Sequence, residues 1–540
     1  MKKITLLLIV NFSFFIFQSF AQAPNWLWAN KAGGSGLEGA GGIAVDGSGN
    51  SYITGRFFSP SITFGSTTLT IGDMYVVKYD ASGNVVWATG AGGTGSANGA
   101  SIAVDGSGNV YVAGDFSGSN IIFGTDTLTN AFPGGPEIFI AKFDASGNAL
   151  WAVHAGGSGT DAARSIAVDG SGNCYVTGSF SSMTGITFGS TTLTNAGQED
   201  IFIAKFDASG NTLWAKSAGG SGSDISSSIC VDGSGNCYIT GIYQSSSITF
   251  GSTTLTTTDG TLFVVKYNGS GTAQWASGGI AGPIDIAVDG SGNTYICGNF
   301  SGSATFGSTT LTGAGNTDMF IAKYNSSGSA VWATGAGGTD YEGAYSLWVD
   351  GIGNIYVDGY FQGVSLTLGS TTLTSAGSSD VFVAKYSSAG NVLWAKSAGG
   401  TGSDLVYGLA VDGSGNSYSI GVYYSTSISF GSSTLTNAGS TDIFVAKLSG
   451  VVGINDINPE NFVSLFPNPV TNELVVNSSE FGDKKEIEIY NLLGEKVYSR
   501  QPQTSNFKPQ TVDVSQLPSG IYFVKLKGEK EERVAKFVKQ

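Results

Sequence analysis

Hydrophobic and polar residues alternate along most of the first 450 residues, in a unit of about 60 residues that recurs along the chain. In each unit an Ile-Ala-Val-like stretch precedes a DGSGN-like turn, and an alternating stretch such as SYITGRF follows it. Alternating β-branched and aromatic residues, bounded by Gly, Asp and Asn, predict strands rather than helices. The seven turns are spaced by 57 to 64 residues and begin at Asp46, Asp105, Asp169, Asp232, Asp289, Asp350 and Asp412. A steady period over seven copies predicts a repeat architecture.

The rest of each unit contains an FGSTTLT-like element, a strand such as DIFIAKFD, a second turn such as DASGN and a strand that ends in Trp-Ala. The chain begins with an isolated fourth strand around Trp28, continues through six complete sets of four strands and ends with three strands. These incomplete ends are complementary, so the strand around Trp28 is expected to pair beside the strand around Phe444. The sequence therefore predicts an all-β fold, a seven-bladed β-propeller closed by the N-terminal strand. This closure would protect the sheet edges at the two ends of the repeat array. Two smaller propellers are disfavoured, because the spacing has no break.

Strand direction assigns the loops to two faces of this propeller. Consecutive strands run antiparallel, so both tight turns of each repeat lie on one face, the bottom. The AGGSG-like connection between repeats and the FGSTTLT excursion lie on the other face, the top, and the excursion is interpreted as a short outer hairpin. Long, variable loops carry binding sites more often than tight turns do. We therefore expect any ligand on the top face.

Carboxylates recur in the top-face connection, eight residues before the turn Asp. This position is acidic in five repeats, where it is occupied by Glu38, Asp161, Asp224, Glu342 and Asp404. One interpretation is a ring around the channel mouth that binds a cation or a polyhydroxyl ligand. The alternative is structural, because a repeated Asp also binds the backbone of its own loop.

Three larger side chains interrupt an otherwise mostly small ring, five residues before the turn Asp. They are Arg164, Tyr345 and Tyr407. Aromatic rings combined with hydrogen-bond donors are typical of sugar sites, and packing against the next blade is the alternative. The candidate ligand site therefore consists of these three residues and the five carboxylates.

Other repeated charges are interpreted as structural. An acid opens the third strand in six repeats and a Lys lies near its end in all seven, which indicates an ion ladder. The DGSGN turns place oxygens as a calcium loop begins but lack the distal Glu of an EF-hand, so a hairpin turn is favoured. No metal and no cofactor is expected.

Composition limits the function classes. The net charge is -15, with 25 basic and 40 acidic residues, which disfavours nucleic acid and anionic membrane surfaces and leaves neutral or cationic partners. His154 is the one histidine, which disfavours a Ser-His-Asp hydrolase and a typical zinc enzyme. The four cysteines are too few for a disulfide framework; free thiols are favoured over a bridge between Cys230 and Cys237.

Residues 1–21 have the basic start, apolar run and small-residue exit of a secretory signal peptide. No later stretch has the length of a transmembrane helix. The mature chain is therefore expected to be exported, with the repeats in residues 22–450.

The repeats resemble a known family. The run GGSGTDAARSIAVDGSGNCYVTG, at residues 156–178, and its copies are similar to the SBBP β-propeller repeat. This resemblance covers roughly residues 24–450 and implies a fold without implying an activity.

The chain changes character after Gly450, where basic and acidic residues become nearly balanced. Residues 451–465 are expected to be a linker, and residues 466–540 alternate like a small antiparallel sandwich. The segments FPNPVTNELVV and VDVSQLPSGIYFVKLK resemble the type A C-terminal sorting domain of type IX secretion. The resemblance implies a Bacteroidota-type cell, interaction with the type IX secretion machinery, and a final place at the cell surface or outside the cell.

These observations favour a non-enzymatic binding module that recognises a glycan or another surface protein. The alternative is an extracellular carbohydrate-active enzyme, a hydrolase or lyase that uses two top-face carboxylates. Repetition of the acids in most blades disfavours that alternative, since catalysis needs one distinct site.

Overall fold

A computed structural model describes residues 24–70, 72–130, 132, 135–257, 261–450, 463–478, 486–491, 494–500, 510–527 and 532–540. Contacts divide the chain into two units, residues 1–452 and 453–540. The expected all-β fold is confirmed, because every element of the described residues is a strand. Accordingly, no helix in these ranges has the length and apolar character needed to cross a membrane. The expected signal peptide and most of the expected linker lie outside these residues.

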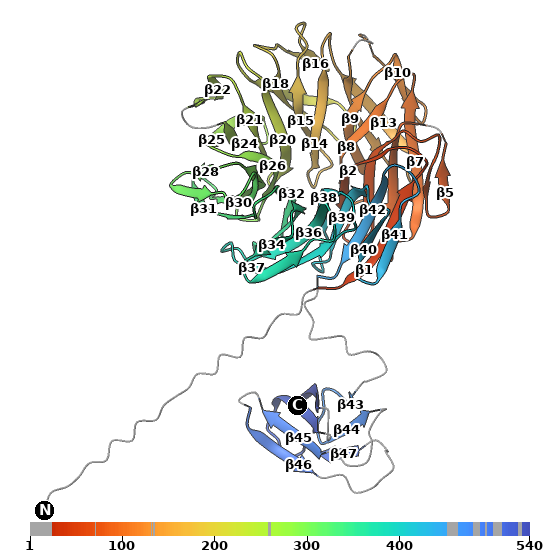
Figure 1. Cartoon of the computed structure of the whole chain (residues 1–540), viewed down its shortest axis with the longest axis vertical. Helices are drawn as coiled ribbons and strands as arrows, with labels where there is room; N and C mark the ends of the chain where they lie inside the picture. Colours follow the sequence, from red (N-terminus) through yellow and green to blue (C-terminus); the bar gives the residue numbers. More distant parts are fainter. Residues whose placement is uncertain are drawn as a thin grey trace, which may run out of the picture. The chain divides into compact units, whose positions relative to one another are not determined.

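The first unit is built from four-stranded antiparallel sheets, one for each repeat (Figure 1). The innermost strands are β2 (Glu38–Val45), β8 (Ala97–Val104), β14 (Asp161–Val168), β20 (Asp224–Val231), β26 (Gly282–Val288), β32 (Glu342–Val349) and β38 (Asp404–Val411). The second strands are β3 (Ser51–Phe57), β9 (Val110–Phe116), β15 (Cys174–Phe180), β21 (Cys237–Tyr243), β27 (Thr294–Phe300), β33 (Ile355–Gln362) and β39 (Ser417–Tyr423). The third strands are β6 (Met74–Tyr79), β12 (Glu137–Phe143), β18 (Asp200–Phe206), β24 (Leu262–Tyr267), β30 (Asp318–Tyr324), β36 (Ser379–Tyr386) and β42 (Asp442–Leu448). The outer strands are β7 (Val85–Gly93), β13 (Ala149–Ala155), β19 (Thr212–Ala218), β25 (Ala273–Gly279), β31 (Ala330–Ala336), β37 (Val392–Ala398) and β1 (Trp26–Gly33).

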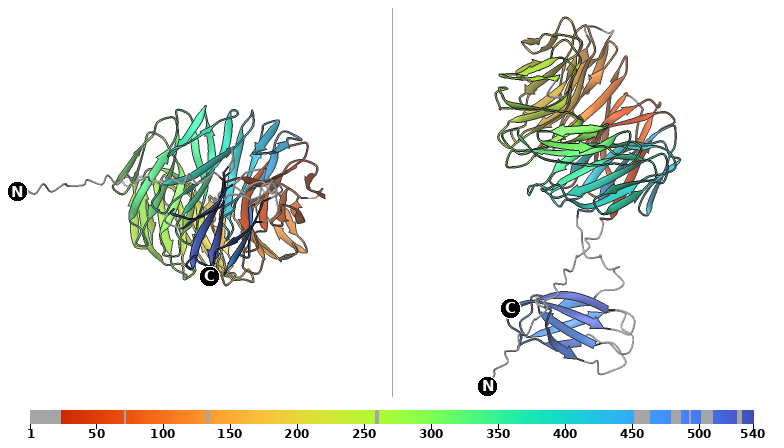
Figure 2. Two further views of the ribbon diagram at one scale, coloured as in Figure 1. Left: turned by 90° about the horizontal axis from the view of Figure 1, so that it is seen from below. Right: turned by 60° about the vertical axis from the view of Figure 1, so that its left-hand side comes forward.

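The sheets stand around a central axis as in a β-propeller (Figures 1 and 2). Each innermost strand contacts the innermost strand of the next repeat, and β38 contacts β2. The first strand of the chain, β1, pairs antiparallel with β42, so that Trp28 lies opposite Lys447 and Lys31 opposite Phe444. The N-terminal strand therefore forms the outer edge of the sheet made by the last repeat.

The FGSTTLT element of each repeat is a short hairpin outside the sheet. The hairpins are β4–β5 (Ile62–Phe64, Thr67–Leu69), β10–β11 (Asn120–Phe123, Asp126–Thr129), β16–β17 (Ile186–Phe188, Thr191–Leu193), β22–β23 (Ser247–Phe250, Thr253–Thr256), β28–β29 (Ser303–Phe306, Thr309–Thr312), β34–β35 (Ser365–Leu368, Thr371–Thr374) and β40–β41 (Ser427–Phe430, Ser433–Thr436). Two of them pair with the outer strand of the preceding sheet, β4 with β1 and β10 with β7. The hairpins thus cover part of an edge that is otherwise open to another strand.

The hydrophobic core lies between neighbouring sheets. Side chains of two adjacent repeats interdigitate in each cluster, as where Ile53 and Val77 pack with Ile420 and Val445 from the last repeat. The second and third strands pack against neighbouring sheets on both faces, so nearly all of their residues are buried.

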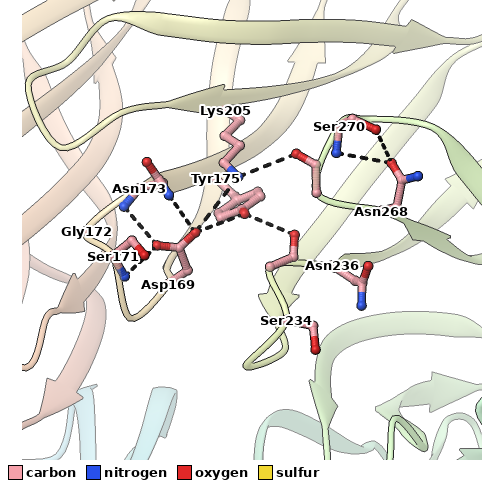
Figure 3. Close-up of polar contacts among 12 residues, drawn as sticks. Asp169, Ser171, Gly172, Asn173, Tyr175, Lys205, Ser234, Asn236, Asn268 and Ser270 are labelled. Atoms are coloured by element: carbon pink, nitrogen blue, oxygen red, sulfur yellow. Dashed lines mark hydrogen bonds and ion pairs between the residues drawn. The ribbon is translucent and has the colours of Figure 1, made fainter.

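Tyr, Lys and turn residues connect each sheet to the next at the bottom face (Figure 3). The Oδ atoms of Asp169 accept hydrogen bonds from the Ser171 and Asn173 amides, the Asn173 side chain and the Tyr175 hydroxyl. Burial alone would raise the pKa of Asp169, but these hydrogen bonds lower it below its usual value. The Tyr175 hydroxyl also lies 3.0 Å from the Gly235 carbonyl oxygen, in the next repeat.

The repeated lysines stack on the repeated tyrosines at this face. Lys nitrogens lie 4.4 to 5.1 Å from the ring centroids of Tyr52, Tyr111, Tyr175, Tyr238, Tyr295, Tyr356 and Tyr418. The expected ion ladder with the strand-opening acids is wrong in its pairing. Lys205 lies 3.9 Å from the turn residue Asp169, whereas the strand-opening Asp200 accepts a hydrogen bond from the Ala196 amide. The two ends of the third strand are at opposite faces, so its acid and its Lys cannot meet.

The four thiols are free, as the sequence favoured. Cys230 lies opposite Tyr238 and Cys237 lies opposite Val231, so the two cysteines are not paired across their hairpin. Burial raises the pKa of the Cys174 and Cys237 thiols to about 12.

The second unit consists of two antiparallel sheets around a small apolar core. One sheet has the order β43 (Val463–Phe466), β44 (Glu473–Ser478), β47 (Gln510–Asp513). The other has the order β46 (Lys496–Arg500), β45 (Glu486–Asn491), β48 (Gly520–Lys527), β49 (Glu532–Lys539).

Deletion of residues 24–33 should destabilise the first unit, because it exposes the edge of β42 and removes the inter-sheet contacts of Trp28. We expect the unfolding temperature to fall by roughly 5 °C or more. Calorimetry on the full-length and shortened proteins measures this change. An unchanged unfolding temperature would show that β1 contributes nothing to the last sheet.

Candidate functional site

A cavity of about 650 Å³ occupies the centre of the first unit. Its walls come from the innermost strands of every repeat, for example Ile43, Ile166 and Leu409. Because these strands alternate, one side of each faces the axis while the other packs against a neighbouring strand. Ile43, Ile166 and Leu409 also belong to the hydrophobic clusters between the sheets, so part of the lining is shared with the core.

A belt of small polar residues on the cavity wall consists of Ser101, Ser165, Ser228 and Ser346, with Asp285 among them. Asp285 is its one acidic member, and its carboxylate accepts hydrogen bonds from the hydroxyls of Ser228 and Ser346 at 2.6 and 2.8 Å. It also accepts bonds from the Ile286 and Leu347 amides. Burial raises the pKa of Asp285 although these bonds oppose the shift. With its oxygens occupied in this way, Asp285 connects three repeats and is not free to act on a ligand.

Three tyrosines from the last two repeats lie together at the top of the cavity. The ring centroid of Tyr345 is 5.5 Å from that of Tyr360 and 6.1 Å from that of Tyr407. Tyr345 and Tyr407 line the cavity, and Tyr407 is 39% exposed. Burial raises the pKa of all three hydroxyls above its usual value, so they are neutral donors at pH 7.

Arg164 lines the same cavity on the opposite wall. Its side chain is exposed, and within the described residues its guanidinium makes no ion pair or hydrogen bond. Asp115, which comes from the neighbouring repeat, lies between Arg164 and a second arginine, Arg56. Burial raises the pKa of Asp115, while the Asn98 side chain and the two arginines act to lower it.

Arg56 belongs to a side pocket of about 290 Å³ that shares Ala40, Asn98 and Tyr407 with the central cavity. Its guanidinium carbon lies 5.1 Å from the ring centroid of Phe58, which is 55% exposed. Arg56 therefore lies in a pocket that adjoins the central cavity next to Tyr407.

The five carboxylates of the expected ring lie elsewhere. Glu38, Asp161, Asp224, Glu342 and Asp404 are buried, and none lines the central cavity. Asp161 accepts hydrogen bonds from the Gly157 amide and the Ser182 hydroxyl, and Asp404 from the Gly400 amide and the Ser425 hydroxyl. These bonds correspond to the structural alternative, because they fold the connection between repeats onto the start of the hairpin excursion. Glu38 lines the side pocket with Arg56 and Tyr407, whereas the other four acids line neither the side pocket nor the central cavity. The structure thus places Arg164, Tyr345 and Tyr407 on one cavity, and of the five acids Glu38 reaches the pocket beside it.

The sequence analysis missed Arg56, Asn98, Asp115 and Tyr360. Arg56, Asp115 and Tyr360 occupy one position, the sixth residue of the second strand, where other repeats carry Ser179, Ile242, Asn299 and Val422. A position that varies in a strand that otherwise repeats was the available signal. Arg56 and Arg164 are also the two arginines of the first 450 residues.

The residues described here contain no cluster of three or more His, Cys, Asp or Glu side chains arranged for a metal ion. The oxygens of the DGSGN turns accept hydrogen bonds from their own loop, which is the hairpin-turn interpretation of these motifs.

Residues 464–540 match the family model of the secretion system C-terminal sorting domain. This match confirms the sorting domain expected from the sequence and indicates type IX secretion to the cell surface or the extracellular space. The domain implies an interaction with the secretion machinery.

Two curated proteins are similar to the chain. An uncharacterized WD repeat-containing protein of Acanthamoeba polyphaga mimivirus is 26% identical over 542 residues, which cover 79% of this chain and 38% of that protein. Regulatory protein FlaEY of Caulobacter vibrioides is 28% identical over 349 residues, which cover 63% and 31%. The chain therefore spans less than half the length of each. The WD-repeat relative agrees with a repeat protein of the β-propeller type.

Among solved structures, a puromycin hydrolase mutant matches 71% of this chain and 58% of its own, at 9% identity and a TM-score of 0.30. Latent PorU from Porphyromonas gingivalis matches 70% of this chain and 32% of its own, at 11% identity and a TM-score of 0.13.

The buried carboxylates predict how stability depends on pH. Burial raises the pKa of Asp200 and Asp404 to about 6, above the value expected in the unfolded chain. The folded state therefore binds more protons between about pH 4 and pH 6, so the free energy of unfolding should rise as pH falls from 7.5 to 5. Below about pH 4 it should fall, because the turn acids such as Asp169 have lowered pKa values and lose their hydrogen-bonded carboxylate form.

Urea unfolding at pH values from 3 to 8 tests this profile, and the Asp404→Asn variant should show a smaller rise between pH 7.5 and 5. A free energy of unfolding that decreases steadily from pH 7.5 to 4 would contradict it.

Proposed function

We propose that this protein is a secreted, non-enzymatic binding module whose ligand sits at the top of the central cavity. The observation that carries the proposal is the meeting of Tyr345, Tyr407 and the unpartnered Arg164 around one opening. Aromatic faces next to free hydrogen-bond donors suit a ligand with both apolar and hydroxyl-bearing surfaces. A glycan, or a surface protein that carries one, has this chemistry.

The scaffold of this module is a seven-bladed propeller of SBBP-type repeats that is closed by the N-terminal strand. The pairing of β1 with β42 and the contact of β38 with β2 support closure. The proposed boundaries are a signal peptide at 1–21, the propeller at 22–450, a linker at 451–465 and the sorting domain at 466–540.

Binding without catalysis is favoured by the position of the acids. A glycosidase needs two carboxyl groups that both reach the scissile bond. The five repeated carboxylates are buried and hydrogen bonded within their loops, and Asp285 is bonded to four donors. Asp115 is a half-buried acid of the central cavity, and Glu38, which lines the side pocket, accepts a hydrogen bond from the Ser59 hydroxyl. Asp115 alone does not supply both an acid and a base.

Replacement of Tyr345 and Tyr407 with Ala should weaken binding of a glycan identified by array screening by roughly 10- to 100-fold, because the aromatic surface of the opening is lost. Tyr341→Ala is the matched control, since Tyr341 is 46% exposed on the same face and does not line the cavity. Calorimetric titration gives the dissociation constants, and thermal unfolding shows whether each variant is folded. If the double variant is folded and binds with unchanged affinity, the ligand lies elsewhere.

Truncation after Gly450 should leave the propeller folded inside the cell envelope and prevent its display. The reason is that the export signal lies in the sorting domain, whereas the propeller has its own core. Protease accessibility on intact cells measures display, with the untruncated protein as control. Normal display of the truncated chain would contradict the proposed export route.

A further inference from the structure

The basic side chains of the first unit are distributed unevenly. Seven of its lysines stack on tyrosines at the bottom face. Lys31, Lys216 and Lys396 lie on outer strands. The two arginines, Arg56 and Arg164, both line the connected pockets at the top. Guanidinium groups are thus concentrated at one place on a domain whose other charges are mostly acidic.

These two arginines are not used by the fold. Within the described part of the chain, neither guanidinium forms a hydrogen bond or an ion pair. Arg56 lies over the face of Phe58 and also interacts electrostatically with Asp115 and Tyr407. Arginine in a structural role is normally paired with a carboxylate or a carbonyl group. Asp115 interacts electrostatically with both guanidinium groups, and Glu38 lines the side pocket with Arg56 but accepts its hydrogen bond from the Ser59 hydroxyl. No carboxylate of the described residues forms an ion pair with either arginine.

The residues form a continuous arc around the opening. Tyr360 and Tyr345 come from the sixth repeat, Tyr407 from the seventh and Arg56 from the first. Asn98 and Asp115 follow from the second repeat, and Arg164 from the third. The rest of the opening carries Ser227 and Ile284. Five consecutive repeats therefore contribute aromatic, cationic or other polar side chains, and the other two contribute small or apolar ones.

We infer that the ligand is a sugar that carries an oxyanion, a carboxylate or a sulfate, which the guanidinium groups of Arg164 and Arg56 hold while the tyrosines stack against the ring. This inference rests on the proposed binding function and names its ligand class. It replaces the expectation of a neutral or cationic partner, which was drawn from net charge alone. A planar guanidinium binds both oxygens of a carboxylate or sulfate in a fork, a geometry that Lys does not offer. The acidic surface elsewhere repels polyanions, so such a ligand would be held at this opening rather than spread over the domain.

The test uses the full chain and three trisaccharide probes: trigalacturonate, its methyl ester and a sulfated trigalactose. The ester has the same shape as trigalacturonate without the charge. We expect the wild-type protein to bind the acid or the sulfated probe at least ten-fold more tightly than the ester, and the better of the two identifies the anionic group. Calorimetric titration at constant ionic strength measures each dissociation constant.

Arg164→Gln should abolish the preference for the anionic probe, and Arg164→Lys should restore it only in part, because the charge returns without the fork. Arg56→Gln should reduce the preference as well. Lys216→Gln is the matched control, since Lys216 is exposed on an outer strand and removes the same charge. Thermal unfolding of each variant confirms that it is folded.

Three results would overturn the inference, and they differ in whether the sugar-binding function also fails. If the ester binds as tightly as the anionic probes and Tyr345→Ala abolishes both, the anionic ligand is wrong and the sugar-binding opening stands. If no probe binds to the wild-type protein, both the ligand class and the sugar-binding function fail. An Arg164→Gln variant that keeps the full preference also refutes the assignment.

Discussion

The architecture depends on the bonds that the end of one sheet makes to the turns of the next. Trp28, Trp87, Trp151, Trp214 and Trp275 each donate an indole N–H, over 3.0 to 3.2 Å, to a backbone carbonyl in the second turn of the following repeat. Across the ends of the chain, the Tyr418 hydroxyl bonds to the Gly49 carbonyl and Lys447 bonds to the Ala81 carbonyl. The last repeat is thereby joined to the first by bonds of the same kinds that join other neighbouring repeats.

These bonds explain why the turns vary so little. The second turn has Gly83 at φ 87° in the first repeat, and a Cβ there would lie within 3 Å of the Trp28 indole. Glycine is needed both for the left-handed backbone and for the close approach of the ring. The first turn of every repeat has its Asp and Asn, and the Asp carboxylate faces Tyr and Lys, as Asp169 does with Tyr175 and Lys205. The second turn keeps its Gly, but Asn268, Asn325 and Ser387 stand in place of its Asp in three repeats. The bottom face is therefore similar in every repeat. Variation is tolerated at the top, because side chains of different length and chemistry make no such bonds to the next repeat there.

The sequence was sufficient for much of the fold, since the strands and the pairing of Trp28 beside the last repeat follow from periodicity and turn chemistry. It was insufficient for the site, because a carboxylate that binds a ligand and one that binds its own loop look alike in sequence. Asp161 and Asp404 are buried and accept hydrogen bonds from Ser182 and Ser425, which keeps them away from the cavity. Only the three-dimensional structure shows this arrangement. Net charge could not indicate the two arginines that line the connected pockets, since it averages over positions that the fold keeps apart.

Repetition itself limits where function can arise in such a chain. A side chain that occurs in every repeat is placed on every sheet and serves a role that every sheet has, such as the stacked lysines. An asymmetric site needs residues that differ between neighbouring repeats and yet line the same cavity. The innermost strands meet this condition, because all repeats meet there. Arg164, Tyr345 and Tyr407 share one position of the innermost strand, while Arg56, Asp115 and Tyr360 share one position of the second strand. Two variable positions, each repeated around one axis, are enough to build an asymmetric opening on a nearly symmetric scaffold.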